Sequence, residues 1–303
     1  MIYTITLNPS ADYLMQLPAL KPGETNRAVS SDLVSGGKGI NVAEVLTNFK
    51  EPVTAMGFLA GFTGSFVKNE VGRKGIHSDF IFTEGLTRIN VKIKAGEETE
   101  INGQGPVISE GEIALLKQKL SNLTEEDLLV LSGSVPAGVP AEFYKEVVEQ
   151  VLKSGAKTVL DTSGEPLKKG IEANPFLIKP NKAELSALYD QPVNDLDAAI
   201  TLGKKAVEDG AENVLLSLGA EGALLINKDE CFTAKAPKGK LINSVGAGDS
   251  MVAGFLYAYA NKIDLKGCFQ YSVAAGSATA FSQGFCTKEQ ADELAVSIAV
   301  QSI

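Results

Sequence analysis

The stretch LLVLSGSVPAGVPAEFYKEVVEQVLKSGAKTVLD, residues 128–161, contains the pattern that decides the fold. An apolar run at 128–132 precedes an amphipathic segment at 141–153, and a second apolar run follows at 158–161. Strands that are apolar throughout and separated by helices are typical of a parallel sheet that helices cover on both faces. This stretch therefore predicts a β–α–β unit of an α/β protein.

The same alternation extends through most of the chain. Further predicted strands lie at residues 2–6, 53–58, 176–179 and 214–217, and further helices at 40–49, 110–120, 182–189 and 196–208. No internal repeat or low-complexity linker divides the sequence. We expect one α/β domain over residues 1–303, with a doubly wound, mostly parallel sheet.

Two regions depart from this alternation. Residues 12–17 and 27–34, and then 88–101, read as strands without intervening helices, and the turn in KIKAGEETEIN (92–102) predicts a hairpin. We expect a small β-sheet lid, inserted from about 12–34 and 88–102. Half-covered sheets act as lids or as dimer surfaces, so a homodimer through the lid is one expected use.

Composition excludes several classes of protein. With 28 basic and 37 acidic residues the net charge is −9, which disfavours nucleic-acid and membrane partners. The uncharged stretch at 267–287 contains glutamines and hydroxyl residues, so we expect a buried helix and a loop there. The three cysteines form no CxxC pair, and the amino terminus has no secretory pattern, which together predict a cytoplasmic protein.

The single histidine, His77, is expected to be structural, so a catalytic base would be a carboxylate or a lysine.

The segment NSVGAGDSMVAG, residues 243–254, is the most informative for chemistry. Gly246, Ala247 and Gly248 form a turn of small residues that leads into an apolar helical run. Free amides at a helix start bind anions, and glycine lets the chain approach a phosphate closely. Asp249 has two interpretations, a carboxylate that stabilises the helix start or a catalytic base. For an isolated motif the first is favoured.

Three other segments have both a structural and a functional interpretation. SGGKGINVA (35–43) is a glycine turn before a helix, or a site where Lys38 binds an anionic substrate. In KPNKAE (179–184), Asn181 and Glu184 fit a capping box, and they also fit the end of a strand where phosphate-bound Mg²⁺ could be reached. SLGAEG (217–222) reads as a strand followed by a turn.

Together and in this order, these segments resemble the phosphofructokinase-B branch of the ribokinase-like sugar kinases. The resemblance begins at TLNPSAD (6–12), covers essentially the whole chain and favours Asp249 as a base. Within the branch, GFLAGFTGSF (57–66) and TEINGQGP (99–106) are more similar to 1-phosphofructokinases than to tagatose-6-phosphate kinases. Ser10 and Ala11 depart from the family, which more often has alanine and an aliphatic residue there, and we expect the change to be tolerated.

The resemblance implies a role for each matching residue. In the catalytic turn, Asp249 would be the base and amides of Gly246, Ala247 and Gly248 would hold the transferring group. The residues expected to bind ATP are Lys179, Asn181, Ser217, Gly219, Gly222, Gly248 and Gly276, and Glu184 would help to hold Mg²⁺, directly or through water. The residues expected to bind the sugar phosphate are Asp12, Gly37, Lys38, Asn41, Arg88 and Arg27. Of these, Lys38, Arg88 and Arg27 are the candidates for its phosphate.

The implied activity is the ATP-dependent phosphorylation of a ketose phosphate. D-Fructose 1-phosphate, giving fructose 1,6-bisphosphate, is the expected substrate, and D-tagatose 6-phosphate is the alternative. A sugar-phosphate sensor without catalysis is the alternative from another class of protein. The presence of Asp249, the glycine turn and Glu184 argues against a sensor.

Overall fold

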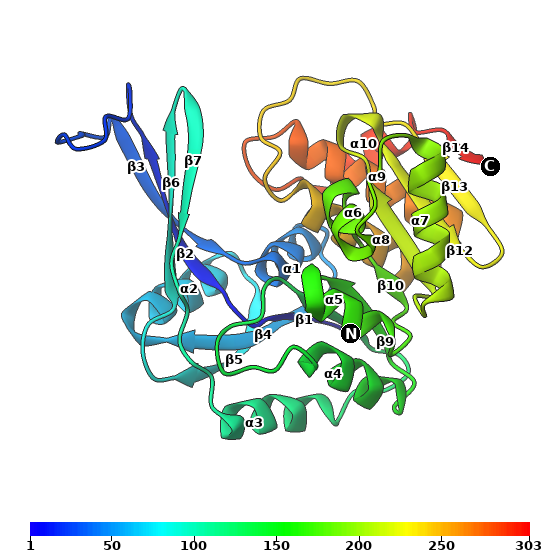
Figure 1. The fold of residues 1–303 in the computed structure, drawn as a ribbon, viewed down its shortest axis with the longest axis horizontal. Helices are drawn as coiled ribbons and strands as arrows, with labels where there is room; N and C mark the ends of the chain where they lie inside the picture. Colours follow the sequence, from blue (N-terminus) through cyan, green and yellow to red (C-terminus); the bar gives the residue numbers. More distant parts are fainter.

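Two sheets of unequal size organise residues 1–303 in the computed structural model (Figure 1). The larger sheet has ten strands in the order β14-β13-β12-β11-β10-β9-β8-β1-β4-β5. Its strands are β1 (Ile2–Thr6), β4 (Val53–Ala60), β5 (His77–Thr83), β8 (Leu128–Ser132), β9 (Lys157–Asp161), β10 (Leu177–Ile178), β11 (Asn213–Ser217), β12 (Ala223–Asn227), β13 (Cys231–Ala234) and β14 (Val300–Ser302).

Helices cover both faces of this sheet. One face packs against α1 (Lys38–Asn48), α2 (Gly61–Arg73), α8 (Ala247–Ala260), α9 (Leu265–Ala280) and α10 (Lys288–Ala295). The other packs against α3 (Glu110–Leu120), α4 (Phe143–Leu152), α5 (Gly164–Ile171), α6 (Lys182–Tyr189) and α7 (Leu196–Glu208). The seven neighbouring strands β11, β10, β9, β8, β1, β4 and β5 are parallel, and every residue of β4 and β8 is buried. The predicted doubly wound α/β fold is confirmed.

One edge of the large sheet differs from the prediction. Strands β12, β13 and β14 are antiparallel to their neighbours, and the sequence pattern did not predict them. A hairpin needs no crossover helix, so this edge lacks the alternation on which the prediction rested. The strand expected at 176–179 is also shorter, because β10 comprises only Leu177–Ile178 between two prolines.

The smaller sheet stands apart from the larger one in Figure 1. Its strands, in the order β3-β2-β6-β7, are β3 (Ser30–Gly36), β2 (Ser10–Gln16), β6 (Arg88–Ala95) and β7 (Glu97–Asn102). Gly96, at φ +86°, makes the turn of the predicted β6–β7 hairpin. We call this sheet the lid sheet. Polar side chains of alternate residues face the large domain, and apolar ones lie on the opposite face.

The prediction of a lid strand that begins at Arg27 is wrong. Strand β3 begins at Ser30, and Arg27 lies in the preceding loop. The side chain of Asn26 closes that loop, because its Oδ1 accepts from the amide of Lys21 and its Nδ2 donates to the carbonyls of Lys21 and Glu24. These bonds hold the segment in a turn and keep it out of the sheet.

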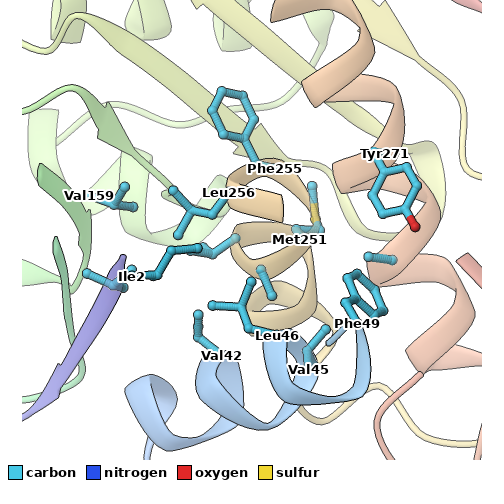
Figure 2. Close-up of a cluster of buried hydrophobic side chains, with 14 of the residues drawn as sticks. Ile2, Val42, Val45, Leu46, Phe49, Val159, Met251, Phe255, Leu256 and Tyr271 are labelled. Atoms are coloured by element: carbon cyan, nitrogen blue, oxygen red, sulfur yellow. The ribbon is translucent and has the colours of Figure 1, made fainter. Parts of the chain in front are cut away.

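A buried apolar cluster holds α1 against α8, as Figure 2 shows. Val42 and Leu46 of α1 lie near Leu256 of α8, and Phe49 makes an edge-to-face contact with Tyr271 of α9 at 5.8 Å between ring centroids. This packing fixes α1 and α8 relative to each other, and with them the polar residues in their first turns. None of the helices combines the length and apolar character that crossing a bilayer requires.

Candidate active site

A cleft of about 840 Å³ lies between the lid sheet and the start of α8. Seven of the predicted site residues line it, namely Asp12, Gly37, Lys38, Asn41, Arg88, Gly246 and Asp249. They come from two lid strands, from the first turns of α1 and from the first turn of α8. The fold thus gathers residues that are more than 200 positions apart in sequence.

The start of α8 is built to present free amides. Gly246 is the N-cap residue at φ +78°, and a methyl group there would come within 2.3 Å of the Phe285 ring. Glycine is therefore required both for the backbone conformation and for the space. The amides of Gly246, Gly248 and Asp249 have no backbone acceptor. Free amides and the helix dipole at this helix start are suited to binding an anion.

Asp249 is buried, with 6% of its surface exposed, in the first turn of α8. Asn41 of α1 donates from Nδ2 to its Oδ2 at 2.7 Å. Burial, and then repulsion from Asp161, raise the pKa of Asp249 to about 7, although the Asn41 hydrogen bond, Lys179 and Lys38 act in the opposite direction. A carboxyl group with a pKa near neutrality is suited to accept a proton in general-base catalysis.

Asp161, at the end of β9, belongs to this site and was missed by the sequence analysis. It is fully buried, and its Oδ1 lies 2.9 Å from Nζ of Lys38 and 3.3 Å from Nζ of Lys179. Burial opposes its ionisation, but the two ammonium groups outweigh that effect and lower its pKa. Its Oδ2 has no partner. An acidic residue at the carboxyl end of a parallel strand was the available signal.

Lys38 is the first residue of α1, and its predicted role at the substrate's phosphate stays a prediction. Its ammonium group contacts Asp161 at 2.9 Å and Glu184 at 3.7 Å, on the large-domain side of the cleft. Burial disfavours its charge, but Asp161, Glu184 and Asp249 outweigh burial and raise the pKa of Lys38 above its ordinary value. This position puts a cation beside Asp249, the candidate base.

Asn181 and Glu184 form the predicted capping box of α6. Asn181 Oδ1 accepts from the Glu184 amide at 2.8 Å, and Glu184 Oε2 accepts from the Asn181 amide at 2.9 Å. The other oxygen, Oε1, is the one that faces Lys38. The structural and functional interpretations of Glu184 are therefore compatible, because they use different oxygen atoms.

Four of the residues predicted to bind nucleotide, Asn181, Ser217, Gly219 and Gly222, lie together beyond the cleft. Asn181 forms a parallel bridge with Ser217 at the end of β11, and a 3₁₀ turn, η1 (Gly219–Glu221), follows directly. Gly219 adopts φ +62° with open space around it, whereas a methyl group at Gly222 would come within 2.0 Å of the Ala234 carbonyl oxygen. This region forms a shelf at the carboxyl ends of β10 and β11, where ligands bind in open α/β sheets.

Two other predicted nucleotide residues have packing roles in this structure. A methyl group on Gly248 would come within 3.1 Å of Nζ of Lys179, so the glycine leaves room for that ammonium group beside α8. A methyl group on Gly276 would come within 2.5 Å of Cγ of Met251, so this glycine lets α9 approach α8. Packing therefore accounts for Gly276, and its predicted contact with adenine stays a prediction.

The lid contributes Asp12 and Arg88 to the cleft. Asp12 of β2 lies 3.2 Å from Nζ of Lys92 through its Oδ2. Arg88 is half-buried, and its Nε donates to the carbonyl of Asn8 at 3.1 Å, which leaves its terminal nitrogens free. Arg27 is exposed and does not line the cleft. The structure therefore brings Asp12 and Arg88 to the site, and does not bring Arg27 there.

Comparison with known proteins shows the family to which the chain belongs. Residues 5–292 match the family described as pfkB family carbohydrate kinase. The chain is 43% identical to a 1-phosphofructokinase of Bacillus subtilis, with 97% of each chain covered. It is 36% identical to a D-tagatose-1-phosphate kinase of Bacillus licheniformis, with 99% of each covered. It also resembles the structure of Escherichia coli phosphofructokinase-2 in its tetrameric inhibited form, with a TM-score of 0.91, 30% identity and 98% of each chain covered.

The chain therefore belongs to the pfkB family of carbohydrate kinases. Its resemblance to 1-phosphofructokinases, predicted from GFLAGFTGSF (57–66) and TEINGQGP (99–106), is confirmed by the relatives. The predicted alternative substrate was D-tagatose 6-phosphate. The tagatose kinase among the relatives is named for tagatose 1-phosphate instead.

Proposed function

We propose that the chain transfers the γ-phosphoryl group of ATP to the 6-hydroxyl of D-fructose 1-phosphate, which yields fructose 1,6-bisphosphate and ADP. The observation that carries this proposal is the position of Asp249. It is a buried carboxyl group, bonded to Asn41, with free helix amides beside it and the cleft in front of it. A non-catalytic sensor would have no need of a carboxylate whose pKa is raised to about 7.

Each reacting group has a candidate partner. The Asp249 carboxylate accepts the proton of the attacking 6-hydroxyl as the oxygen–phosphorus bond forms and the bond to ADP breaks. Amides of Gly246 and Gly248, with the ammonium groups of Lys38 and Lys179, stabilise the negative charge of the transferring group. Phosphoryl transfer needs chiefly such positioning and charge stabilisation, so a single carboxylate is sufficient as the base.

The residues around Asp161 fit a magnesium ion that accompanies ATP. Asp161 Oδ2 is buried without a partner, and Glu184 Oε1 lies 3.7 Å from Nζ of Lys38, which also contacts Asp161. Mg²⁺ prefers oxygen ligands and is held by one or two carboxylates together with phosphate and water oxygens. When bound, the ion neutralises charge on the nucleotide phosphates. ATP would lie on the shelf formed by Asn181, Ser217 and Gly219.

The substrate's own phosphate is assigned to Arg88. Its terminal nitrogens are unpaired and half-buried at the lid side of the cleft, so they can bind a phosphate in a bidentate manner. Lys38 is assigned instead to the phosphoryl group in transfer. Among ketose phosphates, the 43% identity to a 1-phosphofructokinase favours fructose 1-phosphate, and the tagatose-1-phosphate kinase makes its C4 epimer the second candidate.

A coupled assay of ADP release tests this proposal with four substrates: D-fructose 1-phosphate, D-tagatose 1-phosphate, D-tagatose 6-phosphate and D-fructose 6-phosphate. We expect the highest kcat/KM with fructose 1-phosphate. Higher kcat/KM with either 6-phosphate would contradict the substrate assignment. The absence of turnover with all four would contradict the kinase assignment itself.

The outer face of the lid sheet supports a homodimer as a second proposal. Tyr13, Leu33, Ile89 and Ile101 are exposed there, and no element of the chain covers them. An apolar sheet face of this kind is suited to a second copy of the same chain. We expect Ile101→Glu to shift the mass measured by light scattering from dimer to monomer.

Three free, buried cysteines fit the reducing cytoplasm as the location.

A further inference from the structure

The carboxylate of Asp12 is held by three neighbouring side chains of the lid sheet. Ser10 Oγ donates to its Oδ1 at 2.5 Å, and Asn90 Nδ2 donates to the same oxygen at 3.0 Å. The ammonium group of Lys92 lies 3.2 Å from Oδ2. Ser10 is 1% exposed and Asn90 5% exposed, so both hydrogen bonds are shielded from water. Asp12 is therefore fixed in one orientation before any ligand binds.

The strand register explains why these side chains meet. Asp12 of β2 lies directly opposite Asn90 of β6, and Ser10 lies opposite Gly36 of β3. A methyl group on Gly36 would come within 2.5 Å of Ser10 Oγ and within 2.7 Å of Asp12 Cγ. The glycine thus leaves the space that the serine hydroxyl occupies. Three strands converge on one carboxylate at the cleft.

The amide of Asn90 has an unused acceptor. Because the Asp12 carboxylate can only accept hydrogen bonds, the nitrogen of the Asn90 amide must face it and the oxygen must point elsewhere. That Oδ1 is buried and has no partner, and Asn90 lines the cleft. A buried acceptor without a donor is costly, so this atom requires a ligand hydroxyl or a water to satisfy it.

We propose that Ser10, Asp12 and Asn90 form a site that reads neighbouring hydroxyls of the ketose and sets the preference between C4 epimers. The proposal rests on the proposed function, since it takes the ketose to lie in this cleft. Asp12 and Asn90 accept from the sugar hydroxyls directly, while Ser10 is a positioning residue that acts through Asp12. Ser10, whose departure from the family pattern was expected to be merely tolerated, thereby gains a role.

Rigid acceptors discriminate between epimers for a simple reason. The 3- and 4-hydroxyls of fructose lie on opposite faces of the furanose ring, whereas those of tagatose lie on the same face. A fixed pair of acceptors that matches one arrangement leaves an acceptor unpaired with the other, and unpaired buried groups reject a substrate strongly. Loss of the Ser10 hydrogen bond removes one of the three contacts that hold Asp12, so the carboxylate is less firmly oriented and this discrimination weakens.

The test compares Ser10→Ala and Asn90→Ala with Ser272→Ala as a matched control. Ser272 is also a buried serine, but it lies on α9 and its hydroxyl has no partner. For each variant, KM and kcat are measured with D-fructose 1-phosphate, D-tagatose 1-phosphate and ATP. We expect the two lid variants to raise KM for fructose 1-phosphate about 10-fold and to move the ratio of kcat/KM for the two ketoses toward one. KM for ATP stays unchanged, and the control matches the wild type.

Equal losses for both ketoses in Ser10→Ala and Asn90→Ala, or no change in KM for either, would overturn the proposal while leaving the kinase assignment intact. Wild-type turnover of neither ketose would instead overturn the proposed function and this proposal with it. If the alanine variant of Ser10 does not fold, Ser10→Cys keeps the volume with a weaker donor. We expect the same direction of change in the epimer ratio, and an unchanged ratio counts against the proposal.

Discussion

The two ends of the cleft hold their charged groups in different ways. Behind the large-domain end, Asp161 is fully buried and Lys179 is 5% exposed, and Asp161 contacts Lys38, which lines the cleft. Asp161 ends β9, and Lys179 directly follows β10. At the lid end, Lys92 and Glu100 lie on an open sheet, with 17% and 45% of their side chains exposed. The large-domain end is fixed by the core shown in Figure 2, and the lid end by its own side-chain hydrogen bonds.

This difference indicates that the two ends of the cleft have different functions. Chemistry that depends on perturbed pKa values needs burial, and burial is available where α1 and α8 pack together. Recognition of one sugar among several needs contacts whose residues can differ without destabilising the hydrophobic core. The lid strands offer such contacts, because their cleft face carries Asp12, Arg88 and Asn90 and contributes little to the main core.

The strongest test of the large-domain end is Asp249→Asn. The amide can still accept the hydrogen bond from Asn41, so we expect the fold and ATP affinity to be kept. Loss of a general base lowers kcat by about 10²–10⁴-fold. Steady-state kinetics and thermal unfolding measure both quantities. A variant that keeps more than about a third of wild-type kcat would show that Asp249 is not the base.

The second test asks to which end Lys38 belongs. Lys38→Met removes a cation from the transfer site, so we expect kcat/KM to fall about 10- to 150-fold for fructose 1-phosphate and for free fructose alike. Asp161 keeps its contact with Lys179, which limits the loss of stability. Lys145→Met, at an exposed ion pair far from the cleft, is the control. A loss confined to the phosphorylated sugar would show that Lys38 binds the substrate's own phosphate.

Arg88→Ala is the corresponding test at the lid end. Here we expect the loss to be selective, with kcat/KM for fructose 1-phosphate about 10- to 150-fold lower and that for free fructose little changed. KM for ATP is expected to match the wild type, because Arg88 lies on the lid side of the cleft. Equal losses for the two sugars would mean that Arg88 does not bind the substrate's phosphate.

The smallest expected effect belongs to Glu184→Gln. Both hydrogen bonds of the capping box can remain, because the side-chain oxygen of glutamine also accepts from the Asn181 amide. The expected loss of stability is that of a carboxylate at a helix start, about 0.3–1 kcal/mol. The Mg²⁺ concentration for half-maximal activity should rise, because a neutral amide binds the ion more weakly. A Mg²⁺ titration at saturating ATP measures this. An unchanged titration with lowered stability would leave only the structural role.

The sequence allowed the large-domain end of the cleft to be predicted better than the lid end. Asp249, Lys38 and Glu184 lie in short motifs whose glycines and caps have a local physical reason. Ser10 and Asn90 are 80 positions apart, and only the parallel register of β2 and β6 brings them to one carboxylate. Such a meeting depends on strand pairing, which local patterns do not specify.

Asp161 and Arg27 also show where local sequence patterns fail. The sequence analysis missed Asp161 and wrongly placed Arg27 on a strand. Asp161 ends a plain apolar strand without any glycine motif, so its importance emerged only from its contacts with Lys38 and Lys179. Arg27 was expected on a lid strand because it precedes one, but the side-chain bonds of Asn26 turn the chain away. Apolar alternation predicted most of the large sheet, while its antiparallel edge, β12–β14, followed no such alternation.

The pH dependence of kcat/KM for fructose 1-phosphate tests the central claim, that Asp249 is the base, most directly. Burial raises its pKa to about 7, and only the ionised form can accept a proton, so the rate should fall about tenfold per pH unit below 7 and level off above it. The residual rate of Asp249→Asn should lack this break. A wild-type profile that is flat between pH 5.5 and 8.5, or a variant that keeps the same break, would contradict the account.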